Sequence, residues 1–279
     1  MFEEPLLQVR NLSKIYGPTC PKCRTSEKEA LIKNYCASCR TVHACRDISF
    51  DLFEGEILGI VGESGSGKST LMQCLYFDQE ATTGEMILHH PEGRDENLLL
   101  ASARKKRFIR NHKFGMVYQN PMYGLKMDYS AISNVAEKMI AAGNRNVKEM
   151  EAKGNELLQK VNIPSFRAKD APKQFSGGMQ QRVQIAKALS NHPPILFLDE
   201  ITTGLDLSVQ ANVLDLMKDI QVEFGVSMIV VSHDLAVIRM LADRTLVMLD
   251  GKVIEEGLTD QILEDPQHAY TQQLVYSLI

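Results

Sequence analysis

The stretch GESGSGKST, residues 62–70, has residue types and a spacing suited to binding phosphate groups. It matches G-x-x-x-x-G-K-[ST], with a predicted strand before it and a predicted helix after it. Glycines let backbone N–H groups converge on an anion, and the helix N-terminus adds its positive dipole end. Lys68 can reach the outer phosphates and assist their transfer, and Ser69 can ligate Mg²⁺. A chance glycine-rich turn is the alternative, which the full match disfavours. The predicted nucleotide-binding residues are Gly62, Glu63, Ser64, Gly65, Ser66, Gly67, Lys68, Ser69 and Thr70.

Asp199 and Glu200 form an acidic pair at the end of the apolar run ILFLDE. Four apolar residues predict a buried strand, so both carboxylates emerge at its C-terminal end, where ligands bind in open α/β sheets. We expect Asp199 to hold Mg²⁺, directly or through water, and Glu200 to polarise the water that attacks a γ-phosphate. An acidic cap on the following turn is the alternative, and the phosphate loop in the same chain favours catalysis.

Four cysteines lie in two C-x-x-C pairs within CPKCRTSEKEALIKNYCASC, residues 20–39. Two such pairs at this separation suit tetrahedral Zn²⁺ held by four thiolates. Free thiols, redox-active pairs and an iron–sulfur cluster are the alternatives. His43 and Cys45 are close enough in sequence to ligate as well, whereas Cys74 is expected in the core. The predicted metal ligands are Cys20, Cys23, Cys36 and Cys39.

The elements that must position these residues can be predicted from the apolar pattern. LLQVRNLSKIY indicates a strand, DISFDLFEGEILGIVG two strands, and MIVVSH a further buried strand. Asp250-Gly251 predicts a two-residue hairpin turn. Residues 121–190 indicate helices, and the basic stretch 88–113 indicates a solvated connector. Alternating strands and helices predict a mainly parallel α/β core, with an added antiparallel sheet and a helical side lobe.

Composition excludes several classes of protein. The 279 residues are 44% hydrophobic and 24% charged, with a formal net charge of −4. This balance does not indicate a nucleic-acid binder. No apolar run is long enough to cross a bilayer, and MFEEPLLQVR lacks a signal core. We therefore expect a cytoplasmic protein, in which clustered cysteines indicate a metal site rather than disulfides.

The stretch FSGGMQQR, residues 175–182, resembles the signature motif of ATP-binding cassette (ABC) ATPases, with Met179 where the family usually has Gln. The resemblance implies that this motif closes over the γ-phosphate of an ATP bound to the opposite protomer. Two chains, expected as a homodimer, would then enclose two ATPs. The residues that match the motif are Ser176, Gly177, Gly178, Met179 and Gln180.

The other landmarks of that family follow in order. Tyr16 fits the aromatic residue that stacks on adenine, and Gln119 fits the Q-loop glutamine that contacts Mg²⁺. TGLD, residues 203–206, fits the D-loop that crosses the dimer interface, with Asp206 its acidic residue. His233 fits the switch histidine near the γ-phosphate. The implied catalytic set is Glu200, His233, Gln119 and Lys68, and the implied magnesium ligands are Ser69, Gln119 and Asp199. Most relatives have Pro where this chain has Ile201, from which we expect little loss of chemistry.

The resemblance also implies a fold and its divisions. The expected fold is α/β, a P-loop NTPase of the ABC ATPase type, with a RecA-like core, an N-terminal antiparallel β subdomain and an inserted helical lobe. Residues 1–279 are expected to form one ABC ATPase domain, with a signature subdomain over residues 120–190. Compared with the family pattern, about twenty extra residues lie after Tyr16. These form the predicted zinc knob, residues 18–41, which we assign to stability or to partner docking.

Three stretches narrow the resemblance: FSGGMQQRVQIAKAL, TTGLDLSVQANVLDLM and GLTDQILEDPQHAYTQQLV. They are similar to peptide and nickel importer ATPases, and more similar to the ATP-binding subunits of bacterial carbon–phosphorus lyase systems. The segment YQNPMYGLKMDYSAISNV departs from the importer pattern in the region that meets the partner. The expected partner is a soluble lyase complex of phosphonate metabolism. A membrane permease of an importer is the alternative, and a free regulatory or assembly ATPase is a third.

Overall fold

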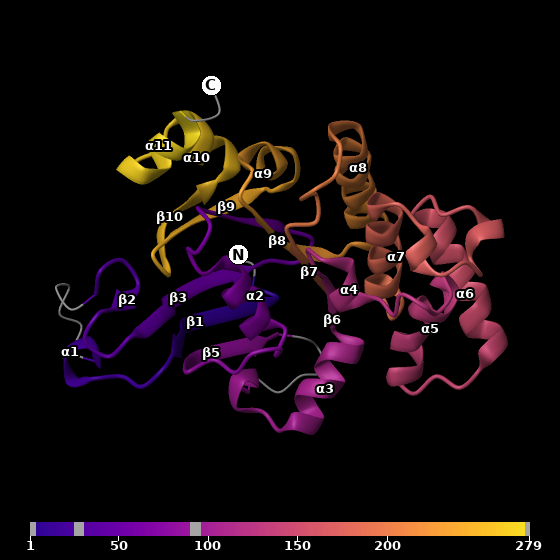
Figure 1. The fold of residues 1–279 in the computed structure, drawn as a ribbon, viewed down its shortest axis with the longest axis horizontal. Helices are drawn as coiled ribbons and strands as arrows, with labels where there is room; N and C mark the ends of the chain where they lie inside the picture. Colours follow the sequence, from indigo (N-terminus) through magenta and orange to yellow (C-terminus); the bar gives the residue numbers. More distant parts are fainter. Residues whose placement is uncertain (1–3, 25–30, 90–95, 277–279) are drawn as a thin grey trace. The chain divides into compact units, whose positions relative to one another are not determined.

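The structure is a computed structural model that describes residues 4–24, 31–89 and 96–276. The chain divides into two compact units, and Figure 1 labels the helices and strands along the chain. Unit 1 comprises Met1–Phe53, Leu58–Ala101 and Val231–Ile279, and unit 2 comprises Glu54–Ile57 and Ser102–Val230.

An antiparallel sheet forms the N-terminal part of unit 1, as the sequence predicts. Its strand order is β2-β3-β1-β5, and the strands span Tyr35–Cys36 (β2), Thr41–Leu52 (β3), Leu7–Tyr16 (β1) and Thr83–Leu88 (β5). Leu7 pairs with Leu52 and Val9 with Phe50. These four side chains are buried, because alternate positions along a strand point to the same face.

Unit 1 also holds strands that flank the phosphate loop. β4 (Ile57–Val61) runs parallel to β9 (Arg244–Leu249), which forms a hairpin with β10 (Lys252–Leu258). Asp250 and Gly251 join the hairpin with φ angles of 49° and 79°, so the predicted two-residue turn is confirmed. The helices of unit 1 are α1 (Pro21–Arg24), α2 (Lys68–Leu75), η1 (Leu98–Leu100), α9 (Leu235–Leu241), α10 (Thr259–Glu264) and α11 (Ala269–Tyr276).

Unit 2 is built on fully buried strands and a group of helices. β6 (Phe114–Val117) pairs in parallel with β7 (Ile195–Asp199), and β8 (Ser227–Ser232), whose residues 227–230 belong to unit 2, adjoins β7. The predicted helical region contains α4 (Pro121–Gly124), α5 (Ala131–Ala141), α6 (Val147–Lys160), η2 (Ser165–Arg167), η3 (Pro172–Gln174) and α7 (Gly177–Leu189), and α8 (Leu207–Phe224) follows β7. The expected division into one domain with a subdomain over 120–190 stays a prediction.

The basic stretch is more ordered than the connector that its composition predicts. Helix α3 (Ala103–His112) occupies much of it. The Ser102 hydroxyl accepts a hydrogen bond from the Lys105 N–H and caps the helix, and Ile109 is its buried residue. The connector interpretation was wrong here because one cap and one buried residue suffice to anchor a charged helix.

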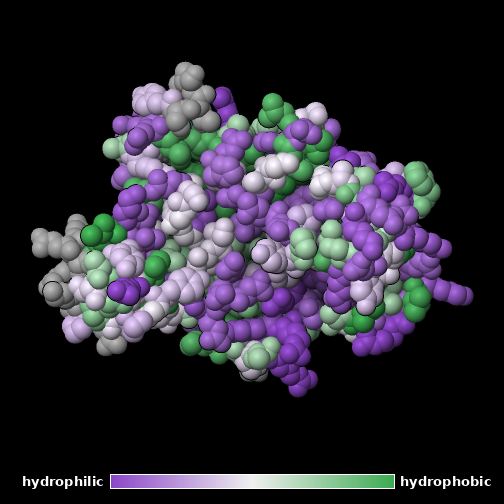
Figure 2. All heavy atoms as spheres, viewed as in Figure 1, coloured by the Kyte–Doolittle hydropathy of each residue, from purple (hydrophilic) through white to green (hydrophobic). Residues whose placement is uncertain are grey.

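The described residues contain no helix long and apolar enough to cross a membrane. The face shown in Figure 2 is largely hydrophilic, and its hydrophobic side chains form small separate groups.

Candidate nucleotide and metal sites

The phosphate loop joins β4 to α2 within unit 1. A Cβ added to Gly62 would lie 2.1 Å from the Met248 carbonyl oxygen, and one added to Gly67 would lie 2.0 Å from that of Ala44. Gly67 also has a φ of 104°. Because a side chain at either position would clash with these carbonyl groups, both positions of the motif require glycine.

The ammonium of Lys68 lies inside this loop. It donates to the carbonyl oxygens of Gly62 at 2.7 Å and Glu63 at 2.9 Å. Lys68 is only 4% exposed. A buried cation surrounded by loop oxygens suits an anionic ligand, because phosphate oxygens are stronger acceptors for an ammonium than carbonyl groups.

Tyr16, the predicted adenine contact, ends β1 beside the same loop. Its side chain forms a hydrogen bond with Thr70, and burial raises the pKa of Tyr16. The ring is 39% exposed, and Lys14 Nζ lies 4.8 Å from its centroid. The structure thus brings together two predicted nucleotide-binding residues, Tyr16 and Thr70.

Tyr270 is a contact to the loop that the sequence analysis missed. The Glu63 N–H donates to the Tyr270 hydroxyl at 2.8 Å. The segment that leads into α11 is held by the Glu255 carboxylate, which accepts hydrogen bonds from the N–H groups of Gln267 at 2.7 Å and His268 at 3.0 Å. Tyr270 lies 207 positions after Glu63, so no local pattern could have indicated the contact.

The acidic pair follows β7 in unit 2. Asp199 is the buried last residue of the strand, and Glu200 adopts a left-handed φ of 46°. Gln119 Nε2 donates to Glu200 Oε2 at 3.1 Å, and the Thr203 hydroxyl donates to the same oxygen at 3.2 Å. The structure therefore brings the predicted Q-loop and acidic residues together. It adds Thr203 as a partner that fixes the carboxylate.

The signature stretch begins helix α7 in unit 2. The Ser176 hydroxyl caps this helix by accepting from the Met179 N–H at 3.4 Å. Gly178 packs against α8, where an added Cβ would lie 2.6 Å from Val209 Cγ1. The Gln180 amide donates to the Pro172 oxygen at 2.9 Å. Ser176 and Gly177 are exposed.

Two further predicted residues lie at helix starts. In unit 2, exposed Asp206 occupies the N-cap position of α8. In unit 1, exposed His233 follows β8, and the next residue, Asp234, caps α9 by accepting from the Ala236 N–H at 2.8 Å. Unit 1 thus carries Tyr16, the phosphate loop and His233. Unit 2 carries Gln119, the acidic pair, the signature and Asp206.

The four cysteines of the predicted knob converge in unit 1. Their sulfur atoms all lie within 4.8 Å of one another. Separations of 3.7 Å (Cys20–Cys23), 3.9 Å (Cys20–Cys36) and 3.6 Å (Cys23–Cys39) match the sulfur–sulfur distance of about 3.8 Å around a tetrahedral Zn²⁺ with Zn–S bonds of about 2.3 Å. The donor set and its spacing therefore fit a metal, and all four thiols are free.

The pKa values and positions of the cysteine thiols distinguish the cluster from the other two cysteines, Cys45 and Cys74. The hydrogen bond to Thr41 lowers the pKa of Cys39 to about 6, whereas burial raises the pKa of Cys23 to about 11. Burial also raises the pKa of Cys45, and raises that of Cys74 to about 11. Cys45 and Cys74 are buried outside the four-sulfur cluster, and the cluster accounts for both C-x-x-C pairs without them.

Comparison with known proteins places these features in a family. Residues 45–203 match the family model described as ABC transporter. A relative from Escherichia coli (strain K12) is 43% identical over 278 residues, covering 100% of this chain and 99% of its own, and is named as the phosphonates utilization ATP-binding protein PhnK. The oligopeptide transport ATP-binding protein OppD of Bacillus subtilis (strain 168) is 38% identical over 85% of this chain and 67% of its own.

Solved structures of ATP-binding cassettes also resemble this chain. An ATP-binding cassette solved as a dimer in a post-hydrolysis state, bound to ADP and Pi, superposes with a TM-score of 0.75 and 28% identity, covering 91% of this chain and 98% of its own. A subunit of a Clostridium perfringens ABC transporter complex has a TM-score of 0.75 at 24% identity, covering 94% and 92%. The fold and the ATPase activity expected from the sequence are confirmed.

Proposed function

The chain belongs to the ABC transporter family, and on that premise we propose that it is the ATP-hydrolysing subunit of a machine for phosphonate use. The observation that carries this proposal is the 43% identity with the phosphonates utilization protein over essentially the full length of both chains. The partner machine that we propose is a soluble carbon–phosphorus lyase complex.

On the family resemblance, we assign the nucleotide chemistry to the residues of the predicted motifs. ATP and Mg²⁺ suit the donors present: Lys68 and the loop N–H groups for the phosphates, the Ser69 hydroxyl and the Asp199 carboxylate for the cation. Mg²⁺, when bound, neutralises charge on the phosphates. Glu200 accepts a proton from the attacking water, and Gln119 and Thr203 hold its carboxylate in one orientation.

Dimerisation completes the proposed reaction. The exposed Ser176 and Gly177 at the start of α7 suit an anion, because backbone N–H groups and the helix dipole converge there. The related cassette was solved as a dimer. We infer that two copies of this chain enclose two ATPs and that closure transmits force to the partner.

Exposed side chains on the helical part of unit 2 support the proposal that a specific partner binds there. Met122, Tyr123 and Tyr129 are 67%, 79% and 61% exposed. They lie in the segment that departs from the importer pattern, and exposed aromatic residues and methionine are typical of protein interfaces. We assign these three side chains to partner docking.

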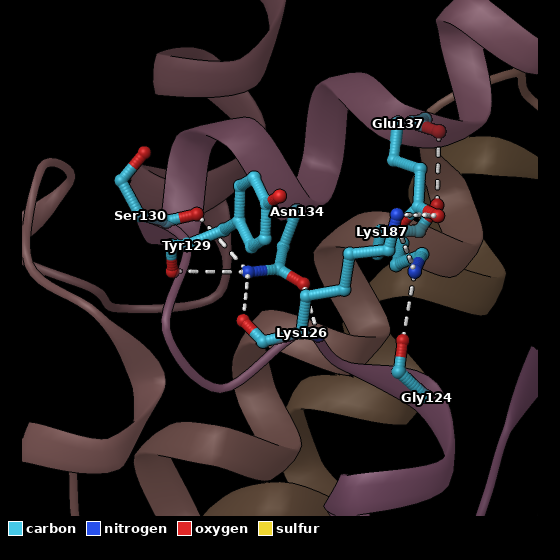
Figure 3. A network of polar contacts seen from close by, with 8 residues as sticks. Gly124, Lys126, Tyr129, Ser130, Asn134, Glu137 and Lys187 are labelled. Atoms are coloured by element: carbon cyan, nitrogen blue, oxygen red, sulfur yellow. Dashed lines mark hydrogen bonds and ion pairs between the residues drawn. The ribbon is translucent and has the colours of Figure 1, made fainter.

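A polar network makes this docking segment rigid (Figure 3). Buried Asn134 accepts from the Lys126 N–H at 2.7 Å and donates to the carbonyl oxygens of Lys126, Tyr129 and Ser130 at 3.0–3.2 Å. Lys187 donates to the Gly124 oxygen and to Glu137, both at 2.8 Å. A preorganised surface binds its partner with less loss of conformational entropy.

Zinc belongs to this proposal as a structural cofactor. Four thiolates at tetrahedral spacing, next to a β2 strand of only two residues, indicate a metal that stabilises a segment with little apolar core. An importer motor docked on a membrane permease is the alternative function, favoured by the 38% identity with the oligopeptide transport protein.

Copurification tests the partner assignment. The tagged chain is isolated from its native cell with ATP present, and bound proteins are identified by mass spectrometry. Soluble phosphonate-degrading subunits are expected, with loss of capture in a Tyr123→Ala, Tyr129→Ala variant and retention in a control with exposed Phe166 changed to Ala. An integral membrane permease would instead establish the importer, and the chain alone would indicate a free ATPase.

A further inference from the structure

A tight turn beside the four-cysteine cluster touches the phosphate loop within unit 1. Ile32 and Tyr35 exchange backbone hydrogen bonds of 2.9 and 3.0 Å, so Lys33 and Asn34 form a two-residue turn between them. Lys33 adopts the left-handed φ of 59° that such turns use. The turn is therefore a defined structure that presents two side chains at its tip.

Both tip side chains reach the loop. Asn34 Nδ2 donates to the Gly65 carbonyl oxygen at 3.4 Å, and Lys33 Nζ lies 3.9 Å from Glu63 Oε1. Gly65 and Glu63 belong to the G-x-x-x-x-G-K-[ST] motif. An exposed ion pair at this distance contributes little, so the Asn34 amide is the contact that matters more.

The turn is attached directly to the cysteine cluster. Cys36, whose sulfur lies 3.9 Å from that of Cys20, is two residues beyond Asn34 and pairs with Thr41 across β2 and β3. The backbone carbonyl oxygen of Asn34 also accepts a hydrogen bond from the His43 N–H at 2.8 Å. A metal that fixes Cys36 therefore also fixes the position of Asn34.

The base of the knob packs on the same loop. Strand β3 passes so close that a Cβ on Gly67 would lie 2.0 Å from the Ala44 oxygen, and the Cys45 thiol contacts the Gly67 oxygen at 3.7 Å. At the start of this strand, the Thr41 hydroxyl donates to the Pro18 oxygen at 2.6 Å and contacts the Cys39 sulfur at 3.1 Å. The cluster thus has two structural connections to the loop, through the turn and through β3.

We propose that metal bound by Cys20, Cys23, Cys36 and Cys39 holds the Lys33–Asn34 turn against the phosphate loop and thereby tightens nucleotide binding. The inference rests on the proposed zinc site. It makes the knob a positioning element for ATP and makes nucleotide affinity depend on metal occupancy. Loss of metal frees the turn, and the loop must then be ordered by the nucleotide at a cost in affinity.

Calorimetric titration with ADP, which avoids hydrolysis, tests this on the full chain. Zinc content is measured first by atomic absorption. One sample stays metal-loaded, and another is stripped with a chelator that is removed before Mg²⁺ is added. We expect the stripped protein to bind ADP about threefold to tenfold more weakly, the effect of one hydrogen bond. Equal affinities would overturn the inference.

Variants distinguish loss of the contact made by the turn from non-specific destabilisation of the knob. Metal-loaded Asn34→Ala should show the same loss as stripping, and stripping this variant should add little, since both changes remove one interaction. Ser38→Ala, an exposed change elsewhere in the knob, should bind ADP like the parent. If the losses in ADP affinity from stripping and from Asn34→Ala multiply, the two changes act independently. That result would overturn the coupling while leaving the zinc site intact. A full chain that binds no zinc would overturn the zinc site itself.

Discussion

The backbone N–H of Glu63 in the phosphate loop donates a 2.8 Å hydrogen bond to the hydroxyl of Tyr270 on α11. This contact joins the C-terminal part of unit 1 to the loop to which we assign phosphate binding. The hydrogen bond restrains the glycine-containing loop before nucleotide binds, and this reduces the entropy lost on binding.

Removing the Tyr270 hydroxyl should therefore weaken nucleotide binding. Tyr270→Phe is expected to raise the Kd for ADP about threefold, as expected for one modest hydrogen bond. Tyr276→Phe, an exposed position on the same helix, serves as the control and should leave the Kd unchanged. Tighter binding by Tyr270→Phe would show instead that the hydroxyl competes with phosphate for the Glu63 N–H.

Glu200→Gln should abolish hydrolysis while preserving ATP-driven dimerisation. The glutamine keeps the shape that Gln119 and Thr203 hold but cannot accept a proton from water. Phosphate release should fall at least about 100-fold, the scale of general-base catalysis. Light scattering with ATP should still detect a dimer.

The matched control is Glu151→Gln on the exposed side of α6. Its rate of phosphate release should equal that of the parent. Hydrolysis by Glu200→Gln at the parental rate would remove Glu200 from the role of base.

Local chemistry explains which features were predictable from the sequence. Gly67 and Lys68 belong to a motif whose residue types and spacing predict the loop conformation. The pair Asp250-Gly251 likewise predicts a two-residue hairpin turn. Fully buried β7 and β8 were visible as continuous apolar runs. In each case the residues that form the pattern lie within a few positions of one another in the chain, so the pattern can be recognised in the sequence.

Contacts between polar residues far apart in the chain were not predictable. Tyr270 and Asn34 reach the phosphate loop only because strand pairing and helix packing elsewhere place them there. Neither has a periodicity or motif that marks it. Asn134 is similar: a buried asparagine in a helix is identifiable only once its four hydrogen bonds are seen.

Asn134→Ala should loosen the segment that we assign to partner docking. The change leaves the Lys126 N–H and three carbonyl groups without this partner, which should lower the free energy of unfolding by about 1–3 kcal/mol in denaturant titrations. Capture of the partner should weaken as well, because Tyr129 loses its support.

Asn155→Ala on α6 provides the comparison, since alanine suits a helix and this side chain is half-buried. It should change the unfolding free energy by no more than about 0.5 kcal/mol. If Asn134→Ala were as stable as Asn155→Ala and captured the partner normally, the network would have no role in docking.

Lys138 makes stability depend on pH. Burial, together with the nearby charges of Lys187 and Arg110, lowers the pKa of this side chain to about 7. Its Nζ donates to the Phe114 carbonyl oxygen. Between pH 7 and about 10 the unfolded chain, in which lysine has its ordinary pKa, binds more protons than the folded chain. The stability of the parent therefore rises with pH in this window.

Lys138→Met should remove that dependence. We expect the variant to be more stable than the parent at pH 7, with the advantage shrinking by roughly 2–4 kcal/mol by pH 10. Urea titrations followed by circular dichroism at pH 7, 8, 9 and 10 measure the difference. Lys148→Met, at an exposed position on α6, is the control for replacing a lysine with methionine. A pH-independent difference for Lys138→Met would mean that Lys138 stays charged in the folded protein.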